Sequence, residues 1–240
     1  MPEKFFLGLD YGTDDEAVKN GLSAIDFLRN EFGRDFVEQK VGVKINEDLL
    51  TGTIDSRHRQ FAESETGIFA DLKLSHGADT GERIIRRVTE YGGLPIRYVT
   101  VSAGLLSTVL SGYVEYAHRH GIDVIAFTLH TKIPAEEANS VYVGDDLDDK
   151  IFNLGNAAYE GGCDAIVLEG ERLQNERIRG LPLKKLVTGI RIDPSDRGTQ
   201  SRVTALDDLK KVKQYVDYVV VSSRYVSNPR SLGAYFSALL

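Results

Sequence analysis

Residues 68–73 read Ile-Phe-Ala-Asp-Leu-Lys, an apolar run that ends in two charged residues. A short, near-continuous apolar segment of this kind predicts a β-strand covered on both faces. Residues two apart in a strand point to the same side, so Asp71 and Lys73 share one face at the edge of the core. This segment predicts both a buried parallel strand and a charged pair at its carboxyl end.

Similar apolar segments recur along the chain and alternate with amphipathic helical stretches such as 17–32, where Ala17, Leu22 and Ile25 fall on one face. The predicted strands are 5–9, 39–45, 68–72, 96–101, 123–129, 164–168, 184–190 and 217–221. This alternation over 240 residues predicts an α/β protein with a closed (β/α)8 TIM barrel, residues 1–240 forming a single domain. An open doubly wound sheet is the alternative, but the turn Asp10-Tyr11-Gly12-Thr13 lacks its usual glycine-rich form.

Composition and charge limit the classes of function. The formal net charge of −7 argues against a nucleic-acid surface, which needs a basic face. No apolar run approaches the length of a membrane span, and no signal segment follows Met1, so we expect a cytoplasmic protein. Cys163 is the only cysteine, opens a predicted strand, and is expected to be a core residue.

Polar residues stand at the ends of the predicted strands. In a barrel these ends converge on one mouth, and clustered lysines and aspartates would shift one another's pKa values. The strand-end residues are Asp10, Lys44, Asp71, Lys73, Ser102, His130, Glu169, Arg191 and Ser222-Ser223-Arg224. No pair of histidines has metal-ligand spacing, so we expect no metal site.

The loops after the seventh and eighth predicted strands carry the donors of an anion site. Phosphate sites in such barrels are built from these two loops. The donors are Arg191, Gln200, Arg202 and Arg224, with the backbone N–H groups near Ser223. Two longer polar connections, 130–149 and 191–202, also follow strands, and long loops on this face often act as lids.

Four motifs resemble those of the orotidine 5′-phosphate decarboxylase superfamily. They are Leu7-Gly8-Leu9-Asp10, Val43-Lys44-Ile45, Ile68 to Lys73 as the start of an Asp-x-Lys-x-x-Asp motif, and Gly189-Ile190-Arg191 followed by Gln200-Ser201-Arg202-Val203. Val221-Ser222-Ser223-Arg224 stands where the family has a Gly-Arg phosphate clamp. The resemblance covers nearly the whole chain, and the motifs occur in the family's order.

The resemblance implies a carboxy-lyase that converts orotidine 5′-phosphate to UMP in pyrimidine biosynthesis. Sugar-phosphate branches of the superfamily carry glutamate at position 44 and use magnesium, whereas Lys44 resembles the nucleotide branch, which needs no metal ion or organic cofactor. The implied catalytic residues are Lys44, Asp71, Lys73 as proton donor, and His76. The implied substrate-binding residues are Asp10, Ser102, Arg191, Gln200, Arg202, Ser223 and Arg224.

His76 departs from the family motif, which has aspartate three residues after the lysine and shares it across a homodimer interface. A cationic histidine would stabilise the substrate carboxylate in the ground state, which works against its loss. The sequence therefore leaves alternatives open: a divergent member acting on another phosphorylated sugar or nucleotide, or a non-catalytic phosphate-binding barrel. The resemblance implies a homodimer.

Overall fold

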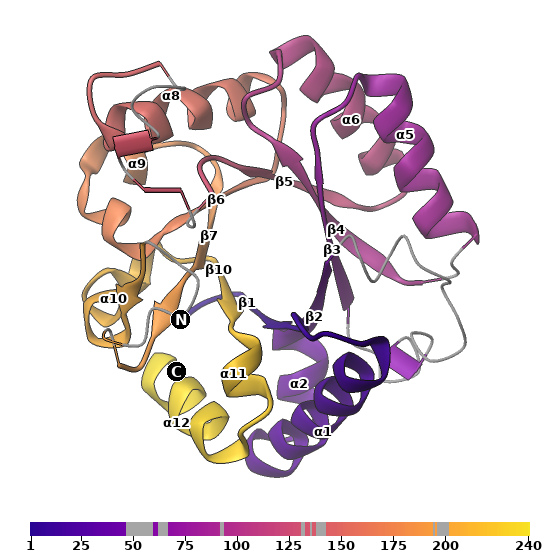
Figure 1. The fold of residues 1–240 in the computed structure, drawn as a ribbon, viewed down its shortest axis with the longest axis vertical. Coiled ribbons are helices and arrows are strands. Elements are labelled where there is room, and N and C mark those ends of the chain that lie inside the picture. The colour runs from indigo at the N-terminus through magenta and orange to yellow at the C-terminus, as the bar shows by residue number, and fades with distance from the viewer. Residues whose placement is uncertain are drawn as a thin grey trace.

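Eight parallel strands form a closed barrel in the computed structural model of the protein (Figure 1). Going round the barrel, their order is β1, β2, β3, β4, β5, β6, β7 and β10, and β10 pairs with β1. The strands are β1 Lys4–Gly8, β2 Val41–Asn46, β3 Gly67–Leu74, β4 Ile96–Ser102, β5 Asp123–Phe127, β6 Ala165–Glu169, β7 Lys184–Thr188 and β10 Tyr218–Val221. The predicted (β/α)8 barrel is confirmed.

The structure describes residues 1–46, 60–61, 67–91, 94–130, 133–134, 136–137, 143–193, 195 and 202–240. Helices in these ranges surround the barrel. They are α1 Asp14–Phe32, α2 Arg34–Lys40, α5 Ala78–Arg86, α6 Ser107–Arg119, α8 Leu147–Glu160, α9 Glu176–Arg179, α10 Leu206–Val212, α11 Ser223–Val226 and α12 Pro229–Leu239, with single turns Arg87–Tyr91, Gly170–Gln174 and Lys213–Tyr215. None of the helices in the described ranges is long and apolar enough to cross a membrane.

Several predicted strand boundaries differ from the observed ones by one or two residues, and the second and seventh strands show the physical reason. The second strand was predicted to begin at residue 39, but Gln39 and Lys40 complete α2. The seventh was predicted to run to residue 190, but β7 stops at Thr188 and the chain turns at Gly189, whose φ of 73° favours glycine. Ile190–Arg191 is the separate strand β8, which pairs with β9 (Thr204–Ala205) outside the barrel.

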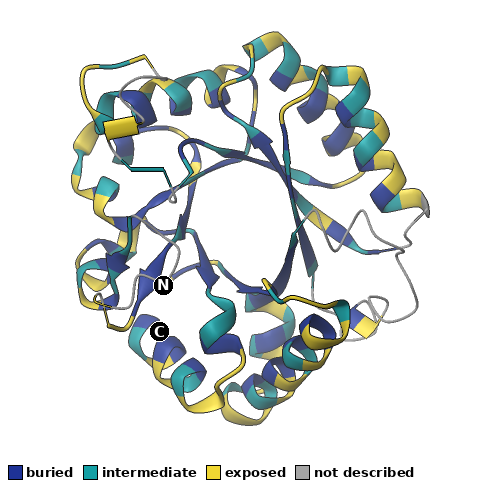
Figure 2. Ribbon diagram, viewed as in Figure 1, coloured by how far each residue is buried: buried dark blue, intermediate teal, exposed yellow. Residues whose placement is uncertain are grey.

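The strands are buried on both sides, as Figure 2 shows by their dark colour. Outside the barrel, apolar side chains of the strands pack against the helices. Inside, Phe6, Phe69, Tyr98 and Tyr218 form one aromatic cluster, with ring centroids of Phe6 and Phe69 4.9 Å apart. Because Tyr98 and Tyr218 lie near the starts of their strands and the Phe6 ring packs against both, this cluster closes the amino-terminal end of the barrel and leaves the carboxyl end for a site.

Candidate active site

A cavity of about 830 Å³ lies at the carboxyl ends of the barrel strands. Its lining divides by chemistry according to which strands contribute. Mainly polar and charged side chains come from β1 to β4 and the residues directly after β1, namely Asp10, Lys44, Asn46, Asp71, Lys73 and Thr100, with Tyr11 and Phe69 as aromatic exceptions. Mostly apolar side chains come from β5 to β7 and the residues directly after β5, namely Phe127, Leu129, His130, Val167, Leu186 and Thr188.

Four charged groups of the polar wall alternate in sign. Lys44 Nζ lies 3.2 Å from Asp10 Oδ1 and 3.0 Å from Asp71 Oδ2. The other ammonium, Lys73 Nζ, lies 3.1 Å from the same Asp71 Oδ2. Asn46 closes the array by accepting a hydrogen bond from Lys44 and donating one to Asp10. The resulting order is Asp10, Lys44, Asp71, Lys73.

Mutual pairing sets the charge states in this array. Burial alone would raise the pKa of Asp71, but Lys44 and Lys73 outweigh burial and hold its pKa well below the usual range. Burial alone would lower the pKa of Lys44, but the carboxylates of Asp71 and Asp10 raise it above the usual value. Asp71 is therefore a carboxylate and Lys44 an ammonium ion at neutral pH.

The local backbone of β3 presents Asp71 and Lys73 to the cavity. The two residues share a strand face, and the register between β3 and β4 shifts between Ala70 and Leu74. Lys73 has a φ of 47°, a left-handed conformation that is costly for a side chain larger than glycine. Thr100 stabilises it, because its Oγ1 accepts from Lys73 N and donates to Asp71 Oδ1, both at 2.8 Å.

Lys73 differs from Lys44 in its access to the cavity. The side chain of Lys44 is 9% exposed and binds oxygens of Asp10, Asn46 and Asp71, so it is fixed in place. The side chain of Lys73 is 32% exposed and, within the part of the chain that the structure describes, forms its ion pair with Asp71. Of these two lysines, Lys73 is the one placed to transfer a proton to a molecule in the cavity.

Hydrogen-bond donors gather at the β7 and β10 side of the cavity. Gly189, Arg191, Ser222, Ser223 and Arg224 line it there. The short helix α11 starts at Ser223, and the first N–H groups of a helix have no partner within the helix. These groups and the guanidinium groups can bind an anion.

Tyr11 connects the two sides of the mouth. Its hydroxyl, on the segment after β1, donates to the carbonyl of Ser223 at 2.9 Å. Burial raises the pKa of Tyr11 to about 12, so the hydroxyl stays protonated and keeps this bond at neutral pH. The anion-binding side is thereby attached to the charged wall.

Not every residue predicted for the site lines the cavity. The cavity brings together Asp10, Lys44, Asp71, Lys73, Arg191, Ser223 and Arg224. Ser102 lies beyond the lining, where its Oγ accepts from Gly104 N at 3.3 Å. Gln200 and most of the 191–202 connection lie outside the described residues, as do parts of the 130–149 connection.

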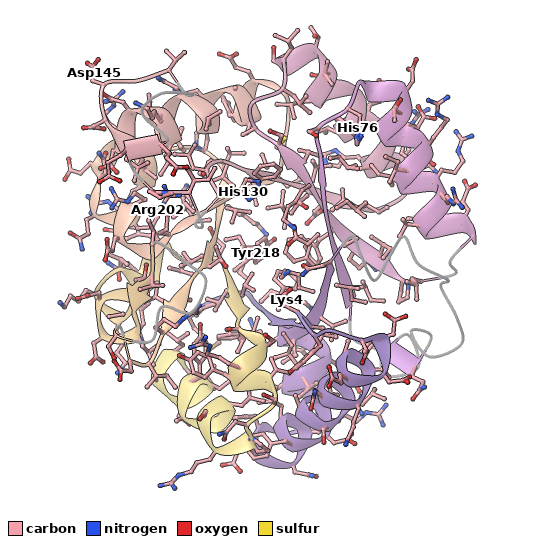
Figure 3. All side chains as sticks on the ribbon, in the orientation of Figure 1. Lys4, His76, His130, Asp145, Arg202 and Tyr218 are labelled. Carbon is pink, nitrogen blue, oxygen red and sulfur yellow. The ribbon has the colours of Figure 1, made fainter. Side chains whose placement is uncertain are left out.

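His76 and Arg202 also lie apart from the cavity lining. His76 is exposed beside α5, and its carbonyl accepts from the Tyr113 hydroxyl at 3.0 Å (Figure 3). Arg202 forms an ion pair with Glu169 at 2.5 Å, on the side of the barrel where His130 lies (Figure 3). Cys163 is buried just before β6, as expected of a core residue.

Asn46, Thr100 and Tyr11 belong to the site but were not predicted for it. Asn46 stands two residues after Lys44, and Thr100 two residues before Ser102. The two-residue period of a strand could have placed both on the inward face. Tyr11 carries no such signal, because it follows the end of β1.

Comparison with known proteins identifies the fold. Neither a protein-family model nor a curated protein sequence matches this chain. Among solved structures, orotidine 5′-monophosphate decarboxylase from Methanocaldococcus jannaschii in complex with the inhibitor BMP is 18% identical with a TM-score of 0.71, covering 100% of this chain and 99% of that one. Orotidine 5′-phosphate decarboxylase from Lactobacillus acidophilus is 16% identical with a TM-score of 0.70, covering 99% of each chain.

A third solved structure of the same fold is an uncharacterized conserved protein from Geobacillus kaustophilus. It is 16% identical with a TM-score of 0.69, covering 98% of this chain and 100% of that one. At these identities the likeness establishes the fold, which is the (β/α)8 barrel of orotidine 5′-phosphate decarboxylases.

The low pKa of Asp71 predicts how its contribution to stability varies with pH. Its folded-state pKa lies below the unfolded value of about 3.9, so the carboxylate favours folding above that pH, and the contribution is lost as pH falls toward the folded pKa. We expect Asp71→Asn to lower the free energy of unfolding by about 3 kcal/mol at pH 7, and the difference from wild type to shrink below pH of about 4. Urea unfolding between pH 3 and pH 8 measures this.

The exposed Asp26, 74% exposed in its ion pair with Arg29, provides the control. Asp26→Asn should change stability by less than about 0.5 kcal/mol at every pH. An Asp71→Asn variant as stable as wild type at pH 7 would contradict the assignment of Asp71 as the central anion of the array.

Proposed function

We propose that this protein decarboxylates orotidine 5′-phosphate to UMP. The observation that carries the proposal is the alternating array of Asp10, Lys44, Asp71 and Lys73 in the cavity. The β7 and β10 side of the same cavity carries hydrogen-bond donors that can bind an anion. The fold shared with orotidine 5′-phosphate decarboxylases supports the same reaction.

Asp71 and Lys73 divide the chemical step between them. The substrate carboxylate lies against Asp71, and the repulsion between the two anions is relieved when CO₂ leaves. The bond between C6 and the carboxyl group breaks, and its electron pair stays on C6. Lys73 then transfers a proton from Nζ to C6, which gives UMP, and the neutral amine regains a proton from water.

Asp10 and Lys44 hold the ribose and keep the Asp71–Lys73 pair in position. Lys44 suits this role because it is buried and bound by three side-chain oxygens. The phosphate binds at Arg191, Arg224 and the backbone N–H groups at the start of α11. The apolar wall from β5 to β7 faces the ring of the base. The step requires no cofactor, because a proton is the only group added.

His76 acts from a second subunit in this proposal. It is exposed outside the cavity of its own chain, on the loop that leads into α5. A homodimer with facing barrel mouths would bring the partner subunit's loop near Lys73. A neutral imidazole there can accept a hydrogen bond from the Lys73 ammonium group.

The direct test is an ultraviolet assay of orotidine 5′-phosphate loss. We expect measurable turnover by the wild type and greater turnover by His76→Asp, because a carboxylate repels the substrate carboxylate and can pair with the ammonium group of Lys73. His76→Asn, neutral and similar in size, is the matched control and should not exceed the wild type.

Activity in His76→Asp alone would mean that the wild-type site acts on a different phosphorylated substrate. Inactivity of both proteins, with intact folding, would contradict the proposed reaction.

Removing the proton donor should separate turnover from binding. Lys73→Ala is expected to lower kcat by about 10⁴-fold, the upper range for a positioned proton donor, because no other ammonium group in the array reaches C6. Affinity for inorganic phosphate should remain, since phosphate binds at the β7 and β10 side. Steady-state kinetics and a thermal-shift titration measure the two quantities, with the exposed Lys19→Ala as the control that keeps full activity.

The subunit arrangement is tested by light scattering. We expect a mass of twice the chain at working concentration, because the site needs the partner subunit's loop for completeness. Leu106 is 74% exposed and precedes α6 in the connection after β4, the strand next to β3, whose connection to α5 carries His76. Leu106→Glu should therefore weaken the dimer and lower activity together. A monomer with undiminished turnover would contradict the shared site.

A further inference from the structure

Arg202 joins segments that are far apart in sequence. Its Nε forms an ion pair with Glu169 Oε1 at 2.5 Å, at the end of β6. Its Nη2 donates to the carbonyl of His130 at 3.0 Å and to that of Leu129 at 3.4 Å, both just after β5. We call these groups the Arg202 cluster: Arg202, Glu169 and the carbonyls of Leu129 and His130.

The Arg202 cluster is buried and its charges are already paired. The Glu169 side chain is 4% exposed and that of Arg202 is 12% exposed. Neither residue lines the cavity, whereas Arg191 and Arg224 do. An arginine whose charge is paired with a buried carboxylate is poorly placed to bind a substrate phosphate. If Arg202 moved to a phosphate, Glu169 would remain as an unpaired buried anion, which is costly.

What the Arg202 cluster does fix is one wall of the cavity. Leu129 and His130, whose carbonyls accept from Arg202, both line the cavity. The His130 ring lies on the ring of Phe127, with centroids 4.8 Å apart and planes tilted by 43°. Phe127 is also part of the lining. The two hydrogen bonds therefore fix the backbone that carries the His130 ring into the cavity lining, beside Phe127.

His130 lies opposite the charged wall, where its ring can contact the part of a bound molecule that the charged wall does not hold. In an eight-stranded barrel, β5 stands across from β1, which carries Asp10. If Asp10, Lys73 and the groups at the β7 and β10 side hold a molecule in the cavity, the part of it that they do not contact would lie against Phe127 and His130. Aromatic and imidazole rings suit a planar heterocycle, by stacking or by hydrogen bonding.

We propose that Arg202 is a positioning residue, not a phosphate ligand, and that through the Leu129 and His130 carbonyls it places His130 against the base of the substrate. The second half of this inference rests on the proposed function, since it assumes a nucleotide. The first half concerns only where Arg202 acts.

Comparing UMP with ribose 5-phosphate isolates the contribution of the base. Both carry the phosphate and the sugar, and only UMP carries the ring. In Arg202→Met we expect UMP affinity to fall about tenfold, equivalent to about 1.4 kcal/mol, with ribose 5-phosphate affinity unchanged. Isothermal titration of the folded variants measures both.

Two further variants guard against effects of misfolding. Arg202→Met leaves Glu169 unpaired, so the double variant Arg202→Met with Glu169→Gln removes both charges and should bind UMP as weakly while folding well. Arg172 is the control, because its ion pair with Asp148 at 2.6 Å is partly buried, with side chains 24% and 27% exposed, and neither residue lines the cavity. Arg172→Met should leave both affinities at the wild-type value.

His130 is tested directly by a double-mutant cycle. His130→Leu should lower UMP affinity by a similar factor, and combining it with Arg202→Met should add little further loss. Equal losses for UMP and ribose 5-phosphate in Arg202→Met would show Arg202 to be a phosphate ligand and overturn the proposal. Unchanged affinity for both would overturn it as well.

Failure of the proposed function would be recognised separately. Wild-type protein that binds UMP no better than ribose 5-phosphate would contradict a nucleotide substrate and the role of His130 with it. The positioning by Arg202 is then judged from the NMR signal of the His130 ring, assigned by its loss in His130→Leu. That signal should shift in Arg202→Met and stay in Arg172→Met, and an unshifted signal would overturn the positioning role.

Discussion

The carboxylate of Asp71 lies between two ammonium groups, with Lys44 at 3.0 Å and Lys73 at 3.1 Å from the same oxygen. The electrostatics of the charged wall depend on this contact. Without the carboxylate, the two ammonium groups would face each other with no anion between them, and their repulsion would be unfavourable. With it, Lys44 is fixed in place and Lys73 faces the cavity. Thr100 completes the arrangement by bonding both the carboxylate and the backbone of Lys73.

Barrel geometry then separates the chemical tasks. Going round the barrel, the charged groups lie on or just after β1 to β3, the mostly apolar wall lies on β5 to β7, and the hydrogen-bond donors for an anion lie after β7 and β10. A molecule with an anionic tail, a polar middle and a flat apolar ring would match this order. The separation has a physical benefit for the proposed reaction, because the arginines proposed to bind the phosphate stay away from the Asp71 carboxylate that this reaction uses.

Much of this arrangement could be predicted from sequence, and the exceptions have a common cause. Apolar strand cores such as Ile68-Phe69-Ala70 and the charged residues that follow them are local signals, so the barrel and the positions of Asp71 and Lys73 follow from a two-residue period. The placement of Arg202 is not local. It depends on the partner Glu169, thirty-three residues away, and on carbonyls that no side-chain pattern reveals. The short β8 and the turn at Gly189 likewise depend on pairing with β9.

The closure of the barrel has a consequence for the nascent chain. β1 pairs with β10, and the Tyr11 hydroxyl binds Ser223, 212 positions later in the sequence. During synthesis the charged residues of β1 to β3 emerge long before the segment that supplies the anion donors. Contacts between such distant residues form slowly, because a long loop must be closed first. The cavity can therefore be completed only after β10 has been synthesised and has paired with β1.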